Sequence, residues 1–381
     1  REWTARMDPI EAELQAVVPP IVTPRWSEKT GKRLKCKVEV FNPGSRVQVA
    51  DRLSKLGAKW NEETPTGKPK VSETTLAEQT HIPEAALVLE YMTVQKKLGL
   101  VKAWLKAVDD DSRIYGRVIS NGAVTGRMTH TSPNLAQVPS DKACRSLFRV
   151  EEGNKLVGCD ASGLELRMLA HYMQDSDYIK TVAEGKKEDG TDIHTVNQMA
   201  ALLDTRDQAK TFIYAFLYGA GDGKIGSIVG GTSKDGARLK ASFLRQVPAL
   251  DRLLKKIAHQ SKKNTTKDYK GESISYLPAL DGRRVWIRHE HAALNTLLQS
   301  AGAIVMKKAL VIADEALREA ELPYKFVANV HDEWQVECPE SAADAVGRVL
   351  QDAIEQAGVA YKLRCPLAGE YMIGDNWSDT H

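Results

Sequence analysis

The sequence lacks paired cysteines and long hydrophobic stretches. Its five cysteines lie far apart and form no CxxC pair; such scattered thiols are more typical of a reducing compartment than of disulfides or a zinc site. No window reaches the roughly 18 uncharged apolar residues that a membrane span needs, and the first residues show no signal-peptide pattern. We therefore expect no membrane segment and a reducing environment.

A large net charge is also lacking, since 53 basic residues face 50 acidic ones. With 42% hydrophobic and 27% charged residues, the composition is typical of a folded globular protein and excludes a disordered or collagen-like chain. Residues 1–150 hold 24 basic and 17 acidic residues, a net charge of +7, whereas the remainder holds 29 and 33, a net charge of −4. This asymmetry suits a polyanion-binding surface beside a carboxylate site that collects cations, although a solvated surface explains the charge more simply.

Strand, helix and turn signals predict an α+β fold, because a strand and several helices precede a strand hairpin instead of repeating βαβ units. Residues 20–82 hold many prolines and glycines and are predicted to form loop with one short helix near 47–56. Ser162 is a candidate N-cap with Glu165 three residues later, the spacing of a capping box. Other helices are predicted at 1–18, 83–108, 206–218, 290–319 and 341–356, and strands at 155–159, 325–330 and 333–337.

Two aspartates occupy rigid positions in this pattern. Asp160 follows a buried strand, and Asp332 lies at the tip of a tight hairpin. If the hairpin packs beside the first strand, the two carboxylates meet and repel each other unless a cation lies between them. Mg²⁺ accepts one or two carboxylates together with substrate phosphates, and two such ions are the usual clamp for in-line displacement at phosphorus. Taken singly, each aspartate is more simply explained as a turn residue or a helix N-terminal charge.

The helix predicted at 206–218 combines cations and aromatic rings on one stripe. Its stripe residues are spaced four apart, so they share one face of the helix: Arg206, Lys210, Tyr214 and Tyr218. The two cations can take phosphate oxygens, and the two rings can take a sugar and a base. Packed aromatics and solvated cations are the simpler alternative, but the order of charge and then ring on one stripe favours binding.

Polar side chains that could contact nucleic acid occur in two other segments. Asn295 and Gln299 lie four apart on the predicted helix 290–319, and Arg127 lies in a turn-rich stretch. They could contact base edges or sugars in a minor groove, or they could cap or solvate their own segments.

Four segments together resemble the family A (polymerase I family) DNA polymerases. Residues 160–167 are similar to the family's motif A, 206–219 to motif B and 330–333 to motif C, and 125–139 are similar to the segment before motif A. The four occur in the family's order and spacing, and the likeness is strongest to the replicative polymerases of T-seven-type phages. The resemblance implies a template-directed DNA polymerase that adds deoxynucleotides to a primer 3′-OH.

The resemblance also implies a right-hand polymerase fold with an antiparallel palm sheet, helical fingers and a partial helical thumb. Residues 1–110 would form a basic thumb-like region truncated at its N-terminus. The palm would combine residues 111–190, with motif A, and 289–381, with motif C. Residues 191–288, with motif B, would form the fingers.

The family's metal site carries over onto matching residues. Asp160 and Asp332, with the Ala161 carbonyl, would bind two Mg²⁺ ions, and Glu333 would support this site. Lys210 would grip the triphosphate and is a candidate general acid for pyrophosphate.

Other matching residues would hold the nucleotide. Glu165 and Tyr214 would exclude a ribose 2′-OH, and a tyrosine at position 214 implies tolerance of dideoxynucleotides. Triphosphate contacts would also come from His194 and Arg206, while Tyr218 would lie near the template base. A dNTP is therefore the expected small-molecule partner.

Primer–template DNA is the expected macromolecular partner. Arg127 and Gln299 would contact minor-groove acceptors of the primer-terminal pair, which all correct pairs share, and Asn295 lies one turn from Gln299. His331 would contact the terminal phosphate of the primer. The resemblance places this activity in the cytoplasm of a bacterial or phage-infected cell, with replisome proteins such as a helicase–primase as further candidate partners.

Two departures from the family pattern qualify this interpretation. No acidic exonuclease motif precedes the first predicted helix, so we expect no proofreading by this chain and an upstream exonuclease-like domain in a longer form. The stretch between that helix and Phe41 is too short for the phage enzymes' large thioredoxin-binding insertion, which makes a thioredoxin-type processivity factor doubtful. A non-catalytic DNA-binding remnant and a two-metal nuclease are the alternative functions.

Overall fold

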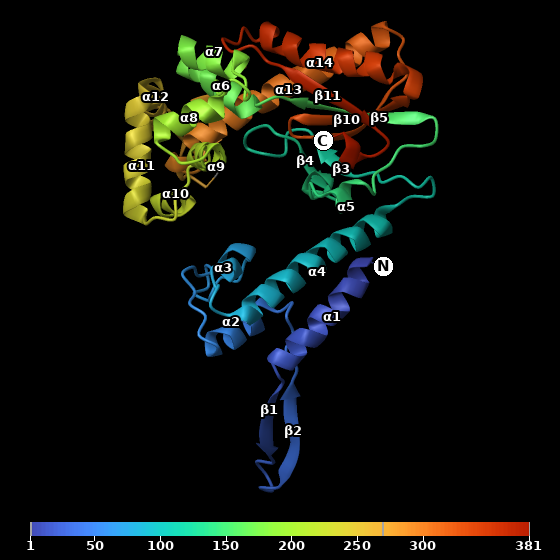
Figure 1. The fold of residues 1–381 in the computed structure, drawn as a ribbon, viewed down its shortest axis with the longest axis vertical. Coiled ribbons are helices and arrows are strands. Elements are labelled where there is room, and N and C mark those ends of the chain that lie inside the picture. The colour runs from blue at the N-terminus through green and yellow to red at the C-terminus, as the bar shows by residue number, and fades with distance from the viewer. Residues whose placement is uncertain (1, 269, 381) are drawn as a thin grey trace. The chain divides into compact units, whose positions relative to one another are not determined.

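The computed structural model describes residues 2–268 and 270–380. The chain divides into two compact units, Arg1–Tyr115 and Gly116–His381 (Figure 1). The first unit consists of α1 (Glu2–Val17), β1 (Ile21–Trp26), β2 (Arg33–Glu39), α2 (Arg46–Lys55), α3 (Glu73–Ala77) and α4 (Pro83–Ala107).

The core of the first unit forms where its helices meet. Apolar side chains of α1, α2, α3 and α4 are fully or almost fully buried together: Leu14, Leu53, Leu76 and Val88. Pro83 occupies the first turn of α4, where its missing N–H costs no helical hydrogen bond. The predicted helices at 1–18, 47–56 and 83–108 are confirmed.

The prediction that residues 20–82 form loop with a single short helix is wrong in part. The structure adds the antiparallel hairpin β1–β2 and the short helix α3. The prolines of this segment, among them Pro24, were the reason for predicting loop. Pro24, however, lies at a register shift between Thr23 and Arg25. A proline is tolerated at such a bulge because no ladder hydrogen bond is required of it.

The second unit contains most of the chain. Its strands are β3 (Arg117–Ile119), β4 (Thr129–Thr131), β5 (Asn154–Ala161), β6 (Thr265–Lys267), β7 (Ser273–Pro278), β8 (Arg284–Ile287), β9 (Lys325–Val330), β10 (Glu333–Pro339) and β11 (Gly369–Gly374). Its helices are α5 (Lys142–Arg145), α6 (Leu164–Met173), α7 (Ser176–Glu184), α8 (Ile193–Ala201), α9 (Arg206–Leu217), α10 (Asp222–Ile228), α11 (Ser233–Gln246), α12 (Pro248–Lys263), α13 (Ala293–Glu319) and α14 (Ala343–Ala360).

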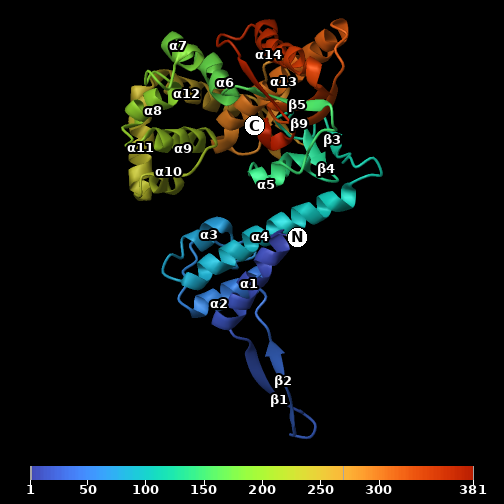
Figure 2. The same cartoon turned by 45° about the vertical axis from the view of Figure 1, so that its right-hand side comes forward.

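The central sheet of the second unit has the strand order β11-β5-β10-β9, and all its pairs are antiparallel. Cys159 lies opposite Trp334, and Val157 lies opposite Val336, so these buried residues share one face. That face packs against α14, which Figure 2 shows beside the sheet. Because side chains alternate along a strand, Asp160 and Glu333 lie on the opposite face.

Helix α13 passes through the middle of the second unit. The segment Glu290–Glu319, which includes α13, is long and apolar enough to cross a membrane by length and composition alone. However, 67% of its apolar window is buried inside the protein. This burial identifies α13 as a core helix, as expected for an interior element of a folded protein.

Helix α9 confirms the predicted division into two faces. Phe212, Ile213 and Leu217 are buried, whereas the stripe that begins with Arg206 remains partly or fully exposed. The helix ends at Gly219, which has a φ of +72°, and a Cβ there would lie only 2.3 Å from the His291 carbonyl oxygen. Only glycine therefore fits this contact without moving the backbone.

The predicted capping box at Ser162 is wrong. Strand β5 continues to Ala161, and the N-cap of α6 is Gly163, with a φ of +58°. This left-handed turn lets the chain leave the sheet and enter the helix within two residues. Arg167 stabilises the turn from the helix, because its Nε donates to the Ser162 carbonyl at 2.7 Å.

Candidate active site

The central sheet brings Asp160 and Asp332 together. Asp332 is the second residue of the two-residue turn between β9 and β10, and the first, His331, is exposed with a φ of +61°. The backbone N–H of Ala161 donates to the Asp332 carbonyl at 3.1 Å, and Glu333 lies opposite Asp160 in the ladder. The two aspartates thus lie side by side, Asp160 near the end of β5 and Asp332 in the turn that leads into the neighbouring strand β10.

Asp160 is the centre of an acidic cluster. Burial raises its pKa to about 7, and the carboxylates of Asp332, Glu333, Glu370 and Glu165 add to this effect. Glu370 lies opposite Asp160 on β11, so acidic residues flank it from both neighbouring strands. A cation bound here would relieve the mutual repulsion.

The donor set of this cluster fits a hard divalent cation that keeps open coordination positions. Within residues 2–268 and 270–380, no group of three or more His, Cys, Asp or Glu side chains is placed to hold a metal. Asp160 and Asp332 would therefore share the ion with a backbone carbonyl, water and substrate phosphates. Mg²⁺ is bound in this way, through one or two carboxylates and substrate oxygens.

Contacts from residues outside the acidic cluster hold the Glu333 carboxylate in place. The Trp377 indole donates to its Oε1 at 2.5 Å, and the Gln335 amide donates to the same oxygen at 2.6 Å. Arg145 approaches Oε2 at 3.8 Å and lies over the Trp377 ring, 4.7 Å from its centroid. These contacts fix the strand that begins directly after Asp332.

Replacing Trp377 with phenylalanine is expected to lower the free energy of unfolding by about 1–3 kcal/mol, because the buried Glu333 carboxylate loses a donor. Urea unfolding of Trp377→Phe, Glu333→Gln and the double variant measures the coupling free energy between Trp377 and Glu333, which we expect to be about 0.5–3 kcal/mol. Trp334→Phe is the matched control, since the Trp334 Nε1 finds no hydrogen-bond partner in the described residues. If Trp334 and Trp377 show the same coupling free energy to Glu333, the assignment of Trp377 as the hydrogen-bond donor to Glu333 is wrong.

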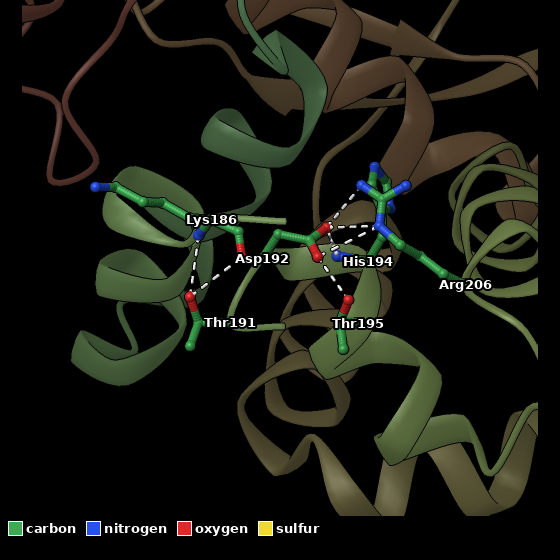
Figure 3. A network of polar contacts seen from close by, with 6 residues as sticks. All are labelled: Lys186, Thr191, Asp192, His194, Thr195 and Arg206. Carbon is green, nitrogen blue, oxygen red and sulfur yellow. Dashed lines mark hydrogen bonds and ion pairs between the residues drawn. The ribbon is translucent and has the colours of Figure 1, made fainter. Parts of the chain in front are cut away.

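Arg206, at the N-terminal end of α9, is positioned by Asp192 (Figure 3). Its guanidinium donates to Asp192 Oδ1 from Nη2 at 2.8 Å and from Nε at 3.1 Å. Burial alone would raise the pKa of Asp192, but hydrogen bonds from Arg206, Thr195 and the His194 N–H lower it to about 2. Asp192 is therefore ionised at neutral pH and orients the guanidinium as a fixed cation.

His194 and Tyr214 extend this site toward the acidic cluster. Their rings lie 6.1 Å apart, and burial together with Arg206 and Lys210 lowers the pKa of His194, although Asp192 opposes this. Burial raises the pKa of Tyr214 to about 12, with contributions from Glu165, Tyr218, Asp332 and Asp160. The neutral hydroxyl of Tyr214 thus lies between the cations of α9 and the two aspartates.

Glu165 links the aromatic end of α9 to the turn-rich segment before β5. Its Oε1 accepts hydrogen bonds from the Tyr218 hydroxyl at 3.1 Å and from Arg127 Nη2 at 3.4 Å. Burial and the Glu165 carboxylate raise the pKa of Tyr218, and hydrogen bonding to Gln299 counteracts this. Asn295 is half-buried, one turn before Gln299 on the same face of α13.

Sequence patterns missed several residues of this site. Asp192 caps α8, and the order Asp192-Ile-His194 was a detectable N-cap signal, but nothing in the pattern ties it to Arg206. Glu370 joins the cluster only through the pairing of β11 with β5. Arg145 and Trp377 come from distant segments, and no local signal could have found them.

A comparison with known protein families identifies the family of this chain. The model of DNA polymerase family A matches residues 25–379 of the chain. The chain belongs to DNA polymerase family A. The predicted resemblance to this family is therefore confirmed.

Relatives of the chain within family A come from phages and bacteria. The DNA-directed DNA polymerases of Enterobacteria phage T3 and Escherichia phage T7 are each 41% identical over 379 residues, covering 90% of this chain and 53% of theirs. DNA polymerase I of Aquifex aeolicus (strain VF5) is 29% identical over 91% of this chain and 59% of its own. The chain spans about half the length of the phage relatives that it matches.

A solved family A structure shows the same fold. The POL domain of Pol1 from M. smegmatis, in complex with DNA primer-template and dNTP, matches with a TM-score of 0.80 and 24% sequence identity. The match covers 100% of this chain and 65% of that one. The predicted α+β polymerase fold, with an antiparallel sheet and helical surroundings, is thus confirmed.

Proposed function

We propose that this chain is the catalytic part of a template-directed DNA polymerase that extends a primer 3′-OH with deoxynucleotides. The observation that carries the proposal is the pair Asp160 and Asp332, adjacent at one end of the two central strands and close enough to Tyr214 on α9 to raise its pKa. An acidic site for cations faces a helix whose first turns carry Arg206 and Lys210. This combination suits a triphosphate with bound metal.

Asp160, Asp332 and the Ala161 carbonyl would hold two Mg²⁺ ions. When bound, such ions lower the pKa of an attacking hydroxyl and neutralise charge on the triphosphate. The chain's own contribution is rigidity: the Ala161 N–H bond to Asp332 and the contacts of Glu333 fix both carboxylates before substrate arrives. Glu333 thus acts as a positioning residue.

The N-terminal half of α9 would bind the triphosphate. Arg206 is oriented by Asp192, and Lys210 is exposed one turn later. The buried Nδ1 of His194 finds no hydrogen-bond partner in the part of the chain that the structure describes, so it can turn toward a phosphate oxygen. Lys210 can donate a proton to the departing pyrophosphate, since an ammonium group is a suitable general acid there.

Glu165 and Tyr214 would select deoxyribose. The Glu165 carboxylate is held by Tyr218 and Arg127, so it cannot easily move away from a ribose 2′-OH. Tyr214 is half-buried and remains protonated at neutral pH, because burial raises its pKa to about 12. Its hydroxyl can therefore donate a hydrogen bond within the nucleotide site.

Replacing Tyr214 with phenylalanine is expected to reduce dideoxynucleotide incorporation relative to deoxynucleotides by roughly tenfold or more. A dideoxynucleotide lacks the 3′-OH, and the Tyr214 hydroxyl can make the hydrogen bond that this group would otherwise make. Single-turnover incorporation of each nucleotide gives the ratio. Tyr276→Phe is the control, and unchanged discrimination in Tyr214→Phe would remove this role.

DNA contacts would come from the side opposite the triphosphate. Arg127 and Gln299 approach Glu165 and Tyr218 from different segments, and Asn295 continues the polar face of α13. Side chains of this kind can contact minor-groove acceptors common to all correct base pairs. The exposed His331, at the turn beside Asp332, would meet the primer's terminal phosphate.

The proposed subdivisions follow the path of the chain. Residues 111–190 and 289–381 would be the palm, and their joint sheet supports this assignment. Residues 191–288 would be the fingers and 1–110 the thumb. The relatives come from phages and bacteria, which supports a polymerase activity in the cytoplasm of a bacterial or phage-infected cell.

We propose that these residues do not proofread. Primer extension with Mg²⁺, four dNTPs and a 5′-labelled primer tests both proposals. Templated extension without primer shortening is expected; absence of extension with intact DNA binding would favour a non-catalytic remnant, and primer degradation would favour a nuclease.

A further inference from the structure

The hairpin β1–β2 projects from the helices of the first unit, as both cartoon views show (Figures 1 and 2). Apart from partly buried Ile21, Cys36 and Glu39, its strand residues are exposed. An isolated two-stranded hairpin is marginally stable in water. A hairpin kept exposed on both faces is therefore suited to contact something outside the unit.

The strand register assigns the hairpin residues to two faces. Thr23 lies opposite Lys37, and Trp26 lies opposite Arg33. Thr23 and Trp26 are three residues apart on β1, so Lys37 and Arg33 lie on opposite faces. The extra residue at the register shift belongs to β2, where Lys35 is part of the bulge opposite Pro24, and Pro24 shares a face with Trp26. We call Trp26, Arg33 and Lys35 the basic face.

The opposite face is mixed in character. Arg25 lies opposite Leu34, and Thr23 lies opposite Lys37, so this face combines two cations with uncharged side chains. The paired valines Val22 and Val38 lie on the face of Trp26, and Val22 is four residues from Trp26 on β1.

The cations of the hairpin have no internal counterions. Residues 21–40 contain six basic and two acidic residues. In the described part of the chain, none of these six cations takes part in an ion pair: Arg25, Lys29, Lys32, Arg33, Lys35 and Lys37. Solvated cations gathered on one hairpin are complementary to a polyanion, because their binding releases the counterions of the polyanion.

The exposed Trp26 indicates which kind of polyanion the hairpin binds. Its side chain is 59% exposed although it is the largest apolar residue type, and it lies directly beside Arg33 on the basic face. An exposed ring beside exposed cations is the arrangement that binds single strands, since unpaired bases stack on the ring while phosphates meet the cations. In duplex DNA the faces of the bases are stacked on one another, so the Trp26 indole would have no base to stack on.

We propose that the basic face of the hairpin binds single-stranded DNA without regard to sequence. The site lies within the first unit and does not depend on the acidic cluster, so it goes beyond the proposed polymerase activity. It would hold unpaired template near the enzyme and lengthen each binding event.

Equilibrium binding of a fluorescent oligo-dT and of a matched blunt duplex to the full chain tests this proposal, across 50–200 mM salt. The double variant Arg33→Ala, Lys35→Ala should lower the slope of log affinity against log salt for oligo-dT by about 1.4, since each phosphate contact on a single strand contributes about 0.7. Trp26→Ala should weaken oligo-dT binding about tenfold and leave the slope unchanged. Duplex affinity should change much less in both variants.

The paired valines provide the matched control, because Val22→Thr with Val38→Thr keeps two β-branched residues in the same paired position and changes no charge. This variant should bind oligo-dT like the wild type, with circular dichroism confirming that all variants fold. Equal losses for duplex and single strand, an unchanged salt slope in the double variant Arg33→Ala, Lys35→Ala, or a loss confined to the valine variant would each overturn the proposal. The last outcome would instead assign the hairpin to a protein partner.

Discussion

Replacing Asp332 with asparagine is expected to reduce nucleotide incorporation at least about a thousandfold, while primer–template affinity changes by less than about threefold. The substitution preserves size and the backbone bond from Ala161 but removes half of the charge that would hold the metal ions. DNA binding relies on other residues, so it should persist. Single-turnover incorporation of one dNTP and a fluorescence binding titration measure the two quantities.

Asp352→Asn is the matched control for this experiment, because Asp352 is exposed on α14 and lies outside the acidic cluster. We expect its incorporation rate to match that of the wild type. Wild-type activity in Asp332→Asn would end the assignment of the active site. Loss of DNA binding along with activity would show that Asp332 has a structural role instead.

Replacing Lys210 with alanine is expected to lower the maximal incorporation rate by about 10²–10⁴-fold, the range typical of a lost general acid. Lys210 is exposed on α9 one turn after Arg206, where a bound triphosphate would meet both cations. Lys210→Arg should restore nucleotide affinity more than it restores rate, because arginine keeps the charge but cannot give up a proton readily.

Rapid-quench kinetics with Lys234→Ala as the control separates these roles. Lys234 is exposed on α11, away from the stripe of α9, and its loss should leave the rate unchanged. If Lys210→Ala changes only the apparent nucleotide affinity, Lys210 binds phosphate without donating a proton. Equal recovery of rate and affinity in Lys210→Arg would lead to the same conclusion.

Much of this site could be predicted from the sequence because its key residues follow strong local patterns. The apolar run before Asp160 fixes β5, and the two-residue gap between β9 and β10 fixes the position of Asp332. The four-residue spacing along α9 separates a binding stripe from a core stripe. Order and spacing of these motifs were enough to indicate the family and the fold.

The rest depended on tertiary contacts that leave no local signal. Glu370 meets Asp160 through strand pairing, and Trp377 reaches Glu333 from 44 residues away. The β1–β2 hairpin was missed for a different reason: its exposed strands bury neither face, so no alternation between core and solvent marked them. The cap of α6 was misjudged because a left-handed Gly163 replaced the expected serine.

The strands of the central sheet are made at very different moments of synthesis. The hydrogen bond between Asn154 on β5 and Glu337 on β10 joins residues 183 positions apart. A nascent chain therefore presents β5 with open edges until the last strands leave the ribosome. A message truncated before β9 would yield a fragment with one of the two aspartates and with β5 unpaired, a product prone to aggregation and destined for degradation.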